Sequence, residues 1–301
     1  MKLSVTVCLC TFRRASVVDT LHSLAAQQLP PDVVLDVVVV DSDSAQSAAD
    51  RVAQAAARLP LAIRYLPAGR PGIAAARNAA VRHAGGEWLA FLDDDEVAAP
   101  DWIARLVAQA RASAAGVVFG AVHTVYPPGC PDWIRRADLF GKSLPPSGTP
   151  VDCGPTCNAL VARELLARES EVFNAAYGHT GGEDTELFHR LARRGVRMVT
   201  CREAVVRETV ETRRLNRDYL LAKAERVGET YFRIFVAGAR PARRLAVLAR
   251  AALQWLGGLV IATVLRPFGL GRSMVFRIKA AANLGKLRAA LGRPAIELYK
   301  V

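Results

Sequence analysis

The stretch WLAFLDDDE, residues 88–96, joins an apolar run typical of a buried β-strand to four consecutive acidic residues. One strand end needs a single acid at most, for instance as the N-cap of a helix that begins near Pro100. Carboxylates separated by one residue can instead reach a hard divalent cation and the phosphates that the cation bridges. The density of acids at this strand end favours the metal site.

Similar apolar, β-branched segments precede this strand, and helix-like stretches separate them. Strands are expected at 3–10, 35–40, 62–66 and 87–92, with helices near 16–28, 45–58 and 73–84 between them. Strands that alternate with helices predict a parallel, doubly wound α/β sheet. Because ligands of such sheets bind at the carboxyl ends of the strands, the residues after each strand are the candidates for a site.

A glycine-containing segment, GRPGIAAARN at 69–78, opens the helix expected near 73–84. Glycines at a helix start let backbone N–H groups approach an anion, and Arg77 adds a positive charge. The segment is neither the dinucleotide motif GxGxxG nor a P-loop. A plain turn followed by a helix would give the same pattern, so this segment alone leaves both interpretations open.

The strand–helix pattern breaks after residue 126, where proline and glycine crowd the segments 126–133 and 143–158. Long loops inside a compact domain are often functional. Beyond them, GHTGGEDTELF at 178–188 places Glu183 and Asp184 in the first turn of an amphipathic helix. Acids in a first turn are ordinary partners of the helix dipole, and the functional alternative is a general base.

The cysteines indicate reduced thiols. None of the six has CxxC spacing, and Cys8 and Cys10 alternate with apolar residues as small buried hydrophobes would. Reduced thiols fit a cytoplasmic protein. Met1 leads directly into the first expected strand, so we expect no signal peptide.

The formal charge of +12 is concentrated near the C-terminus. Residues 213–301 carry 18 Lys and Arg against 4 Asp and Glu, whereas residues 1–212 are close to neutral. With 51% hydrophobic residues the chain is expected to be mostly globular rather than disordered. We therefore predict a catalytic domain over 1–212 and a basic helical region over 213–301.

An apolar stretch lies within this basic region, at 245–265. Its uninterrupted part, residues 251–265, is shorter than the roughly 20 residues needed to span a bilayer. Flanking basic residues favour an interfacial helix on anionic lipid, with a soluble helical hairpin as the main alternative. A nucleic-acid-binding arm is disfavoured because phosphate-tracking segments are not this hydrophobic.

Taken together, these segments resemble inverting glycosyltransferase family 2. The matching segments are CTFRR at 10–14, VDS at 40–42, GxxxARN at 72–78, FLDDD at 91–95 and ED at 183–184. The resemblance covers about residues 3–210, in the order and spacing of the family. It implies the GT-A fold, a Rossmann-like and mostly parallel sheet flanked by helices, here followed by a helical membrane-associating tail.

The resemblance also implies roles for individual residues. On the donor side, Thr11, Arg13 and Asp41 would line the nucleoside pocket. Arg77 would lie near the diphosphate and Asp93 would contact the ribose or sugar, with Gly72 and Asp94 also on the donor side. Asp95 would ligate Mn²⁺ or Mg²⁺. Asp184 would be the catalytic base beside Glu183, and Asn158 would help to shape the acceptor side.

The C-terminal segment GKL at 285–287, followed by Gly292 and Tyr299, is similar to the ends of bacterial exopolysaccharide enzymes of the succinoglycan type. The family resemblance implies a nucleotide-sugar donor, with a UDP-sugar favoured, whereas the basic region around an apolar stretch favours a lipid-linked saccharide acceptor. We therefore expect a peripheral or monotopic protein at the cytoplasmic face of the bacterial inner membrane, with no nucleic-acid partner. The QxxRW motif of processive polymerases is absent, which favours transfer of a single sugar.

Two alternatives remain at the level of sequence. One is a catalytically inactive nucleotide-binding or scaffold protein of the same fold, although all the expected acids are present. The other is a sugar nucleotidyltransferase, which should carry a glycine-rich loop after the first strand, and residues 11–14 contain no glycine. The family often has a metal-binding His after the ED helix. Here residues 206–208 read VRE, so the sequence identifies no third protein ligand.

Overall fold

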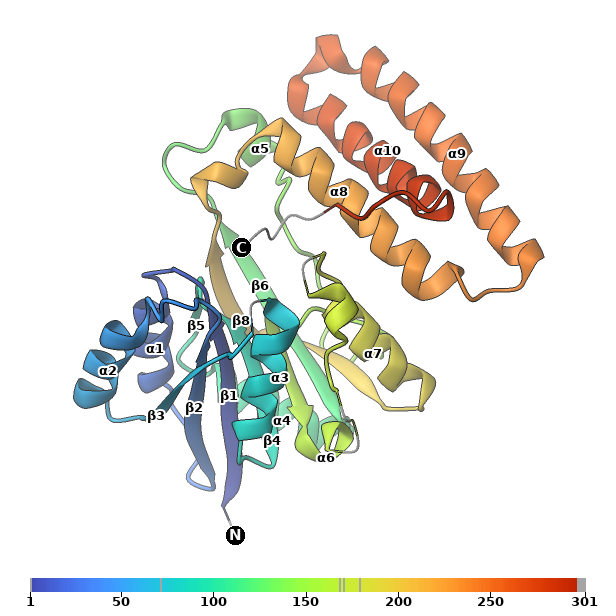
Figure 1. The fold of residues 1–301 in the computed structure, drawn as a ribbon. Coiled ribbons are helices and arrows are strands. Elements are labelled where there is room, and N and C mark those ends of the chain that lie inside the picture. Colours follow the sequence, from blue (N-terminus) through green and yellow to red (C-terminus); the bar gives the residue numbers. More distant parts are fainter. Residues whose placement is uncertain (1, 71, 168, 170, 179, 297–301) are drawn as a thin grey trace.

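The computed structural model describes residues 2–70, 72–167, 169, 171–178 and 180–296. Within them, eight strands form one sheet in the order β3-β2-β1-β4-β7-β6-β8-β5 (Figure 1). The strands are β1 (Leu3–Thr11), β2 (Val33–Asp41), β3 (Ala62–Pro67), β4 (Trp88–Asp93), β5 (Glu96–Ala98), β6 (Val117–Val125), β7 (Asn158–Ala162) and β8 (Met198–Thr209). The helices are α1 (Val17–Ala25), α2 (Ala49–Arg58), α3 (Ile73–His83), α4 (Trp102–Ser113), α5 (Asp132–Arg136), α6 (Arg163–Leu166), α7 (Glu183–Arg193), α8 (Arg217–Tyr231), α9 (Pro241–Val264) and α10 (Leu270–Ala290).

The predicted α/β fold with a mostly parallel sheet is confirmed. Strands β3, β2, β1 and β4 are parallel neighbours, whereas β7 runs antiparallel between β4 and β6. The segment predicted as a long loop over 143–158 therefore ends in a buried central strand. Short β5 pairs antiparallel with β8, which brings the chain after the acidic segment back to the sheet.

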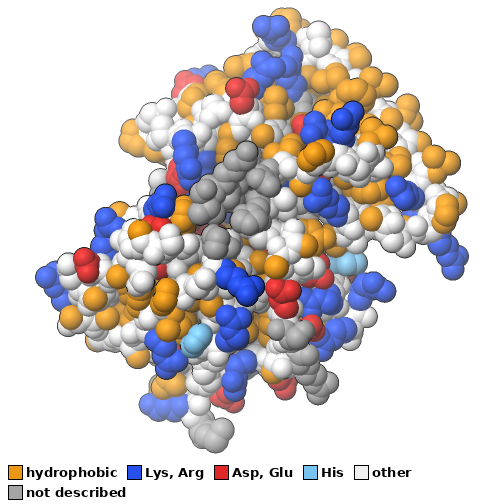
Figure 2. All heavy atoms as spheres, viewed as in Figure 1, with side chains coloured by type: hydrophobic (Ala, Val, Ile, Leu, Met, Phe, Trp, Pro, Cys, Tyr) orange, Lys and Arg blue, Asp and Glu red, His pale blue; other side chains and the backbone are white. Residues whose placement is uncertain are grey.

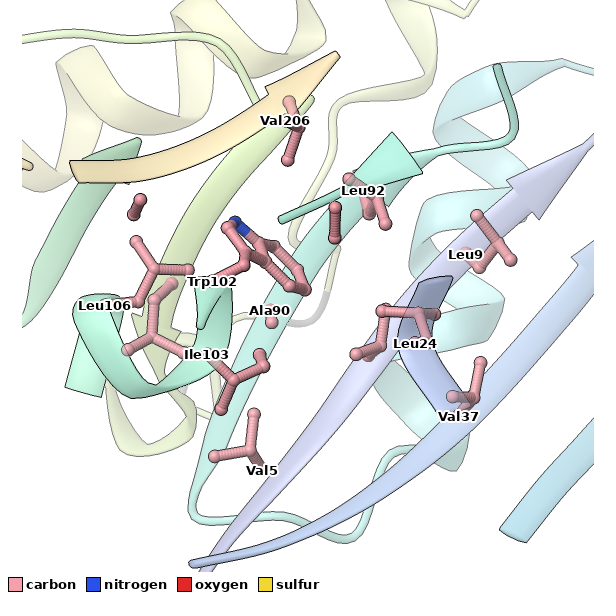
Figure 3. Packing of buried hydrophobic residues seen from close by; sticks show 14 of the residues in the cluster. Val5, Leu9, Leu24, Val37, Ala90, Leu92, Trp102, Ile103, Leu106 and Val206 are labelled. Carbon is pink, nitrogen blue, oxygen red and sulfur yellow. The ribbon is translucent and has the colours of Figure 1, made fainter. Parts of the chain in front are cut away.

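Apolar side chains fill both faces of the sheet. On one face, Trp102 and Leu106 of α4 pack over Val5 and Ala90 (Figure 3). On the other face, α3 and α7 cover the strands through residues such as Phe188. A sheet buried on both faces explains why its central strands are continuous apolar runs.

The carboxyl ends of three neighbouring strands meet at one edge. Thr11 of β1 is in register with Asp41 of β2, and Cys10 of β1 is in register with Asp93 of β4. Neighbouring strands lie about 4.8 Å apart. The residues after β2, β1 and β4 therefore form one contiguous surface.

The C-terminal helices form a layer in which α10 lies between α8 and α9 (Figure 1). An apolar cluster joins this layer to the preceding chain, because Ile134 and Phe140 pack with Leu215 and Leu220. The division predicted after residue 212 thus falls inside a packed cluster. Tyr299, part of the predicted C-terminal similarity, and His179 of the glycine-rich segment lie outside the described residues.

Candidate active site

The four acidic residues at the end of β4 differ in the solvent exposure of their side chains. The side chain of Asp93 is 38% exposed, whereas Asp94 and Glu96 are buried. Asp95 lies between these extremes at 11%. Asp93 is thus the side chain most accessible to a ligand, and the other three are less exposed and lie beside it.

The Asp94 carboxylate stabilises the segment at the end of β1 and directly after it. Its carboxylate accepts hydrogen bonds from Thr11 Oγ1 at 2.8 Å and from Arg14 Nη1 at 2.6 Å. Thr11 and Asp94 are only 2% and 4% exposed. The two side chains face each other and support the segment after β1, and their predicted contact with the donor stays a prediction.

Arg14 is a site residue to which the sequence analysis assigned no role. Its Nη1 lies 2.9 Å from Asp95 Oδ2, and its Nη2 donates to Glu211 Oε1 at 2.6 Å. Arg214 approaches the same Asp95 oxygen at 3.9 Å. Burial, and next the charge of Asp93, raise the pKa of Asp95 to about 7 despite these cations. Arg14 is the second arginine of the CTFRR segment, and its place in that segment was the only indication in the sequence that it belongs to the site.

The acids fit a hard divalent cation. Ligand atoms of Asp93, Glu96 and Cys157 lie within 4.8 Å of one another. Glu96 Oε1 is buried and has no hydrogen-bond partner. Asp93 and Glu96 offer the carboxylate oxygens that Mg²⁺ and Mn²⁺ prefer, whereas the Cys157 sulfur is a softer ligand. Glu96 was missed as a candidate, although it directly follows the three aspartates in the sequence.

A cavity of about 410 Å³ lies at the carboxyl edge of the sheet, where residues at the ends of β2 and β3 and Arg13 after β1 line it. Its lining includes Arg13 and Asp41, which were predicted for the nucleoside, together with Asp43 and Arg70. The Asp41 carboxylate is occupied, because it accepts hydrogen bonds from Tyr65 Oη and from the backbone of the 43–48 loop. Asp41 therefore fixes the cavity wall. Arg13 Nε and Nη2 both lie 3.1 Å from the Asp43 carboxylate.

A second cavity of about 550 Å³ adjoins the start of α3 and shares Arg70 with the first. Gly72, predicted on the donor side, lines it and precedes α3. Its φ of +108° is one that glycine adopts readily, which explains the glycine at this turn. Arg70 had no assigned role, although it directly follows Gly69 in the glycine-containing segment.

Arg77 connects the two acidic segments of the site. It is 7% exposed, forms an ion pair with Glu183 through Nη1, and lies 3.2 Å from Asp93 Oδ1 through Nη2. Burial raises the pKa of Glu183, and the charge of Arg77 opposes that rise. Arg77 therefore connects the end of β4 with the start of α7, and its predicted location near the donor diphosphate stays a prediction.

Asp184 is more open than its neighbour Glu183. Its Oδ1 accepts a hydrogen bond from Thr185 N at 2.7 Å, and the contact is only partly buried. Glu183 is 4% exposed. Of the two acids predicted for catalysis, Asp184 is thus the more accessible to solvent.

Asn158 does not face an acceptor. It is fully buried at the start of β7, where its Oδ1 accepts from Trp102 Nε1 at 2.8 Å. Its Nδ2 donates to the carbonyl groups of Ala121 and Ala204, both at 2.9 Å. Every polar atom of the side chain is engaged inside the sheet, so the predicted acceptor role is corrected to a structural one.

Asn158→Ala is expected to lower the free energy of unfolding by about 2–4 kcal/mol, because it leaves three buried polar groups without partners. The apparent KM for the acceptor should not change. Thermal unfolding and acceptor titration of the same preparation would test both expectations. A raised acceptor KM in a variant of normal stability would restore the original prediction.

Comparison with known proteins agrees with this geometry. The model of the family described as "Glycosyl transferase family 2" matches residues 6–167. The chain is 33% identical over 298 residues to the succinoglycan biosynthesis protein ExoM of Rhizobium meliloti, covering 99% of this chain and 96% of that protein.

Among solved structures, the chain is similar to the mannosyltransferase PcManGT from Pyrobaculum calidifontis in complex with GDP-Man and Mn²⁺. The TM-score is 0.68 at 21% identity, over 98% of this chain and 89% of that one. It is also similar to S. aureus TarS in complex with UDP, with a TM-score of 0.51 at 18% identity, over 97% of this chain and 92% of that one. These likenesses establish the GT-A fold.

Proposed function

Because this chain belongs to glycosyl transferase family 2, we propose that it transfers one sugar from a nucleoside-diphosphate sugar to a saccharide acceptor, with inversion at the anomeric carbon. The chain is a glycosyltransferase by its family, and its similarity to ExoM supports a role in polysaccharide synthesis. The donor, the acceptor, the metal and the stereochemistry are the parts that we propose.

One observation carries the proposal: the cavity at the ends of β2 and β3, which Arg13 after β1 also lines, lies at the same carboxyl edge of the sheet as the acidic end of β4, with only β1 between β2 and β4. A nucleoside in the cavity would direct its diphosphate and sugar toward Asp93. The neighbours solved with GDP-Man and with UDP support such a donor. We favour UDP as the nucleotide.

Asp184 is the proposed base. It accepts the proton of the acceptor hydroxyl while that oxygen forms a bond to the anomeric carbon. The bond from the anomeric carbon to the diphosphate oxygen breaks, and its electron pair leaves with the diphosphate. Attack from the side opposite the leaving group inverts the configuration.

The remaining charged residues prepare this reaction. Asp95, the predicted ligand, together with Asp93 and Glu96 beside it, would hold a divalent cation, which when bound supplies electrostatic stabilisation of the leaving diphosphate. Arg14 orients Asp95. Arg77 orients Asp93 and Glu183, so the donor side and the base side are fixed relative to each other before the substrates bind.

The exposed apolar side of α9 supports a membrane partner. Leu253, Leu256, Val260 and Val264 recur at helical spacing and are each more than half exposed. Figure 2 shows hydrophobic side chains gathered over this helix, with basic side chains around them. Apolar residues bordered by arginine suit the surface of an anionic bilayer, where each basic residue contributes about 1 kcal/mol.

Among the described helices, α9 alone is long and apolar enough to cross a membrane. Its packing favours lying flat instead. The inner side of α9 is seated on α10, where Ser273 Oγ donates to the Ala262 carbonyl at 2.7 Å. Five basic residues lie along α10: Arg272, Arg277, Lys279, Lys286 and Arg288. A spanning α9 would draw them into hydrocarbon at about 2.5–3.5 kcal/mol each, so we propose a monotopic protein at the cytoplasmic face.

The full chain is expected to sediment with anionic vesicles and to be released in part by high salt. Leu253→Asp combined with Val260→Asp should abolish sedimentation, because both side chains would enter the acyl region as charges. Val34→Asp, at an exposed valine of β2, is the matched control. If the wild-type chain does not sediment with anionic vesicles at low salt, the lipid-linked acceptor loses its main support.

The proposed reaction can be tested with labelled donors. Incubation of the full chain with radiolabelled nucleotide sugars and membranes that hold lipid-linked saccharides should place label in the lipid extract. Label that enters only water-soluble saccharides would contradict the lipid-linked acceptor. Absence of label from every saccharide would contradict transfer itself.

A further inference from the structure

Helix α8 of the C-terminal region contacts the loop that precedes the two proposed catalytic acids. Arg226 Nη1 donates a hydrogen bond to the Thr180 carbonyl oxygen at 3.1 Å. Thr230, one helical turn further along α8, packs against Gly182. A Cβ atom on Gly182 would lie 2.5 Å from Thr230 Cγ2. One turn of α8 therefore contacts both ends of the segment 180–182.

This segment needs support from outside. Gly181 and Gly182 have φ values of +74° and +104°, which glycine adopts readily, and glycine is also the most flexible residue type. Asp184 follows directly in the first turn of α7. A change in the path of the glycine pair would therefore move its carboxylate.

The rest of the protein holds the acids from the opposite side. Arg77 of α3 is paired with Glu183, which is enclosed by its surroundings. The chain after α8 also packs along α7, because the rings of His189 and Phe235 lie 4.5 Å apart. Helix α7 thus contacts α3 through Glu183 at its start and the chain after α8 through His189 in its middle.

We propose that Arg226 and Thr230 are positioning residues for sugar transfer, and that α8 completes the active site by fixing the path of residues 180–182. This inference rests on the proposed function. The nucleoside cavity is lined by residues 13–70 and has no part in this contact. The two positions therefore affect turnover without affecting nucleotide binding.

Arg226→Met in the full chain keeps the length of the side chain and removes its N–H donors. The expected result is a kcat about 10–100-fold lower, the usual range for a supporting partner of a functional group, with unchanged nucleotide affinity. Arg226→Lys should recover part of the rate, because an ammonium group can still donate to the Thr180 carbonyl. Arg217→Met, at an exposed position in the first turn of α8, is the control and should retain full activity.

A second pair of variants tests the packing contact. Thr230→Leu adds volume against Gly182 and should lower kcat, whereas Thr230→Val preserves the shape and should not. Thermal unfolding shows whether each variant is folded. A folded Arg226→Met or Thr230→Leu chain with normal kcat would overturn the inference, and so would a parallel loss of nucleotide affinity. The wild-type chain in the same assay distinguishes failure of this inference from failure of the proposed function. If the wild-type chain itself does not transfer sugar, the proposed function is contradicted.

Discussion

Asp95→Ala is expected to abolish sugar transfer and to remove the effect of Mn²⁺ on nucleotide affinity. The proposed cation would lose a carboxylate at the strand end that faces the donor, and the leaving diphosphate would lose the stabilisation that the cation provides. Titration calorimetry with a nucleoside diphosphate, in Mn²⁺ and in EDTA, would measure the effect on binding. A transfer assay would measure the loss of activity.

Asp95 also pairs with Arg14, so the variant must be shown to be folded. Asp95→Asn keeps the size of the side chain and should behave like the alanine variant. Asp101→Ala removes an exposed carboxylate that pairs with Arg105, outside the acidic segment, and it should retain metal-dependent binding. Nucleotide affinity that is indifferent both to EDTA and to loss of Asp95 would contradict a metal held at this strand end.

Asp184→Asn should leave donor binding nearly intact and lower the rate of transfer by roughly 10²–10⁴, the usual range for loss of a general base. The amide oxygen can still accept the hydrogen bond from Thr185 N, so the start of α7 should keep its shape. What is lost is the capacity to take the proton of the acceptor hydroxyl. Steady-state rates at saturating donor, together with nucleotide titration, would separate the two quantities.

Glu186→Gln is a suitable control for this change. Glu186 lies on the same helix and pairs with Arg190, four residues further on. Its loss should have little effect on turnover. If Asp184→Asn keeps near-normal turnover, Asp184 acts only at the helix terminus, and Glu183 becomes the next candidate for the base.

The sequence was sufficient to predict the mostly parallel sheet and its first four strands, β1 to β4. The β-branched segments that form β1, β2 and β4 can be recognised from their own sequence, because strands buried on both faces must be continuously apolar. Their polar carboxyl ends meet wherever such strands are parallel neighbours. The cluster of Arg13, Asp41 and Asp93 at one edge thus follows from local pattern and general topology alone.

The remaining features depend on partners far away in the sequence. Asn158 follows a proline- and glycine-rich loop, yet Trp102 encloses it in the sheet. Arg14 meets Asp95 only because Glu211, 197 residues further along the chain, anchors its other nitrogen. The charge pattern separated the C-terminal region at residue 212 but carried no information about Arg226 and its contact with the loop before Asp184.

Metal-assisted cleavage of a nucleotide sugar at the Asp93–Asp95 strand end is the central step of the proposed function. A panel of nucleotide sugars, incubated with the full chain and Mn²⁺, should show release of nucleoside diphosphate from at least one donor. Release should stop in EDTA and in the Asp95→Ala variant, while Asp101→Ala should match the wild type. Equal release from that donor by the wild-type and Asp95→Ala chains would contradict the account.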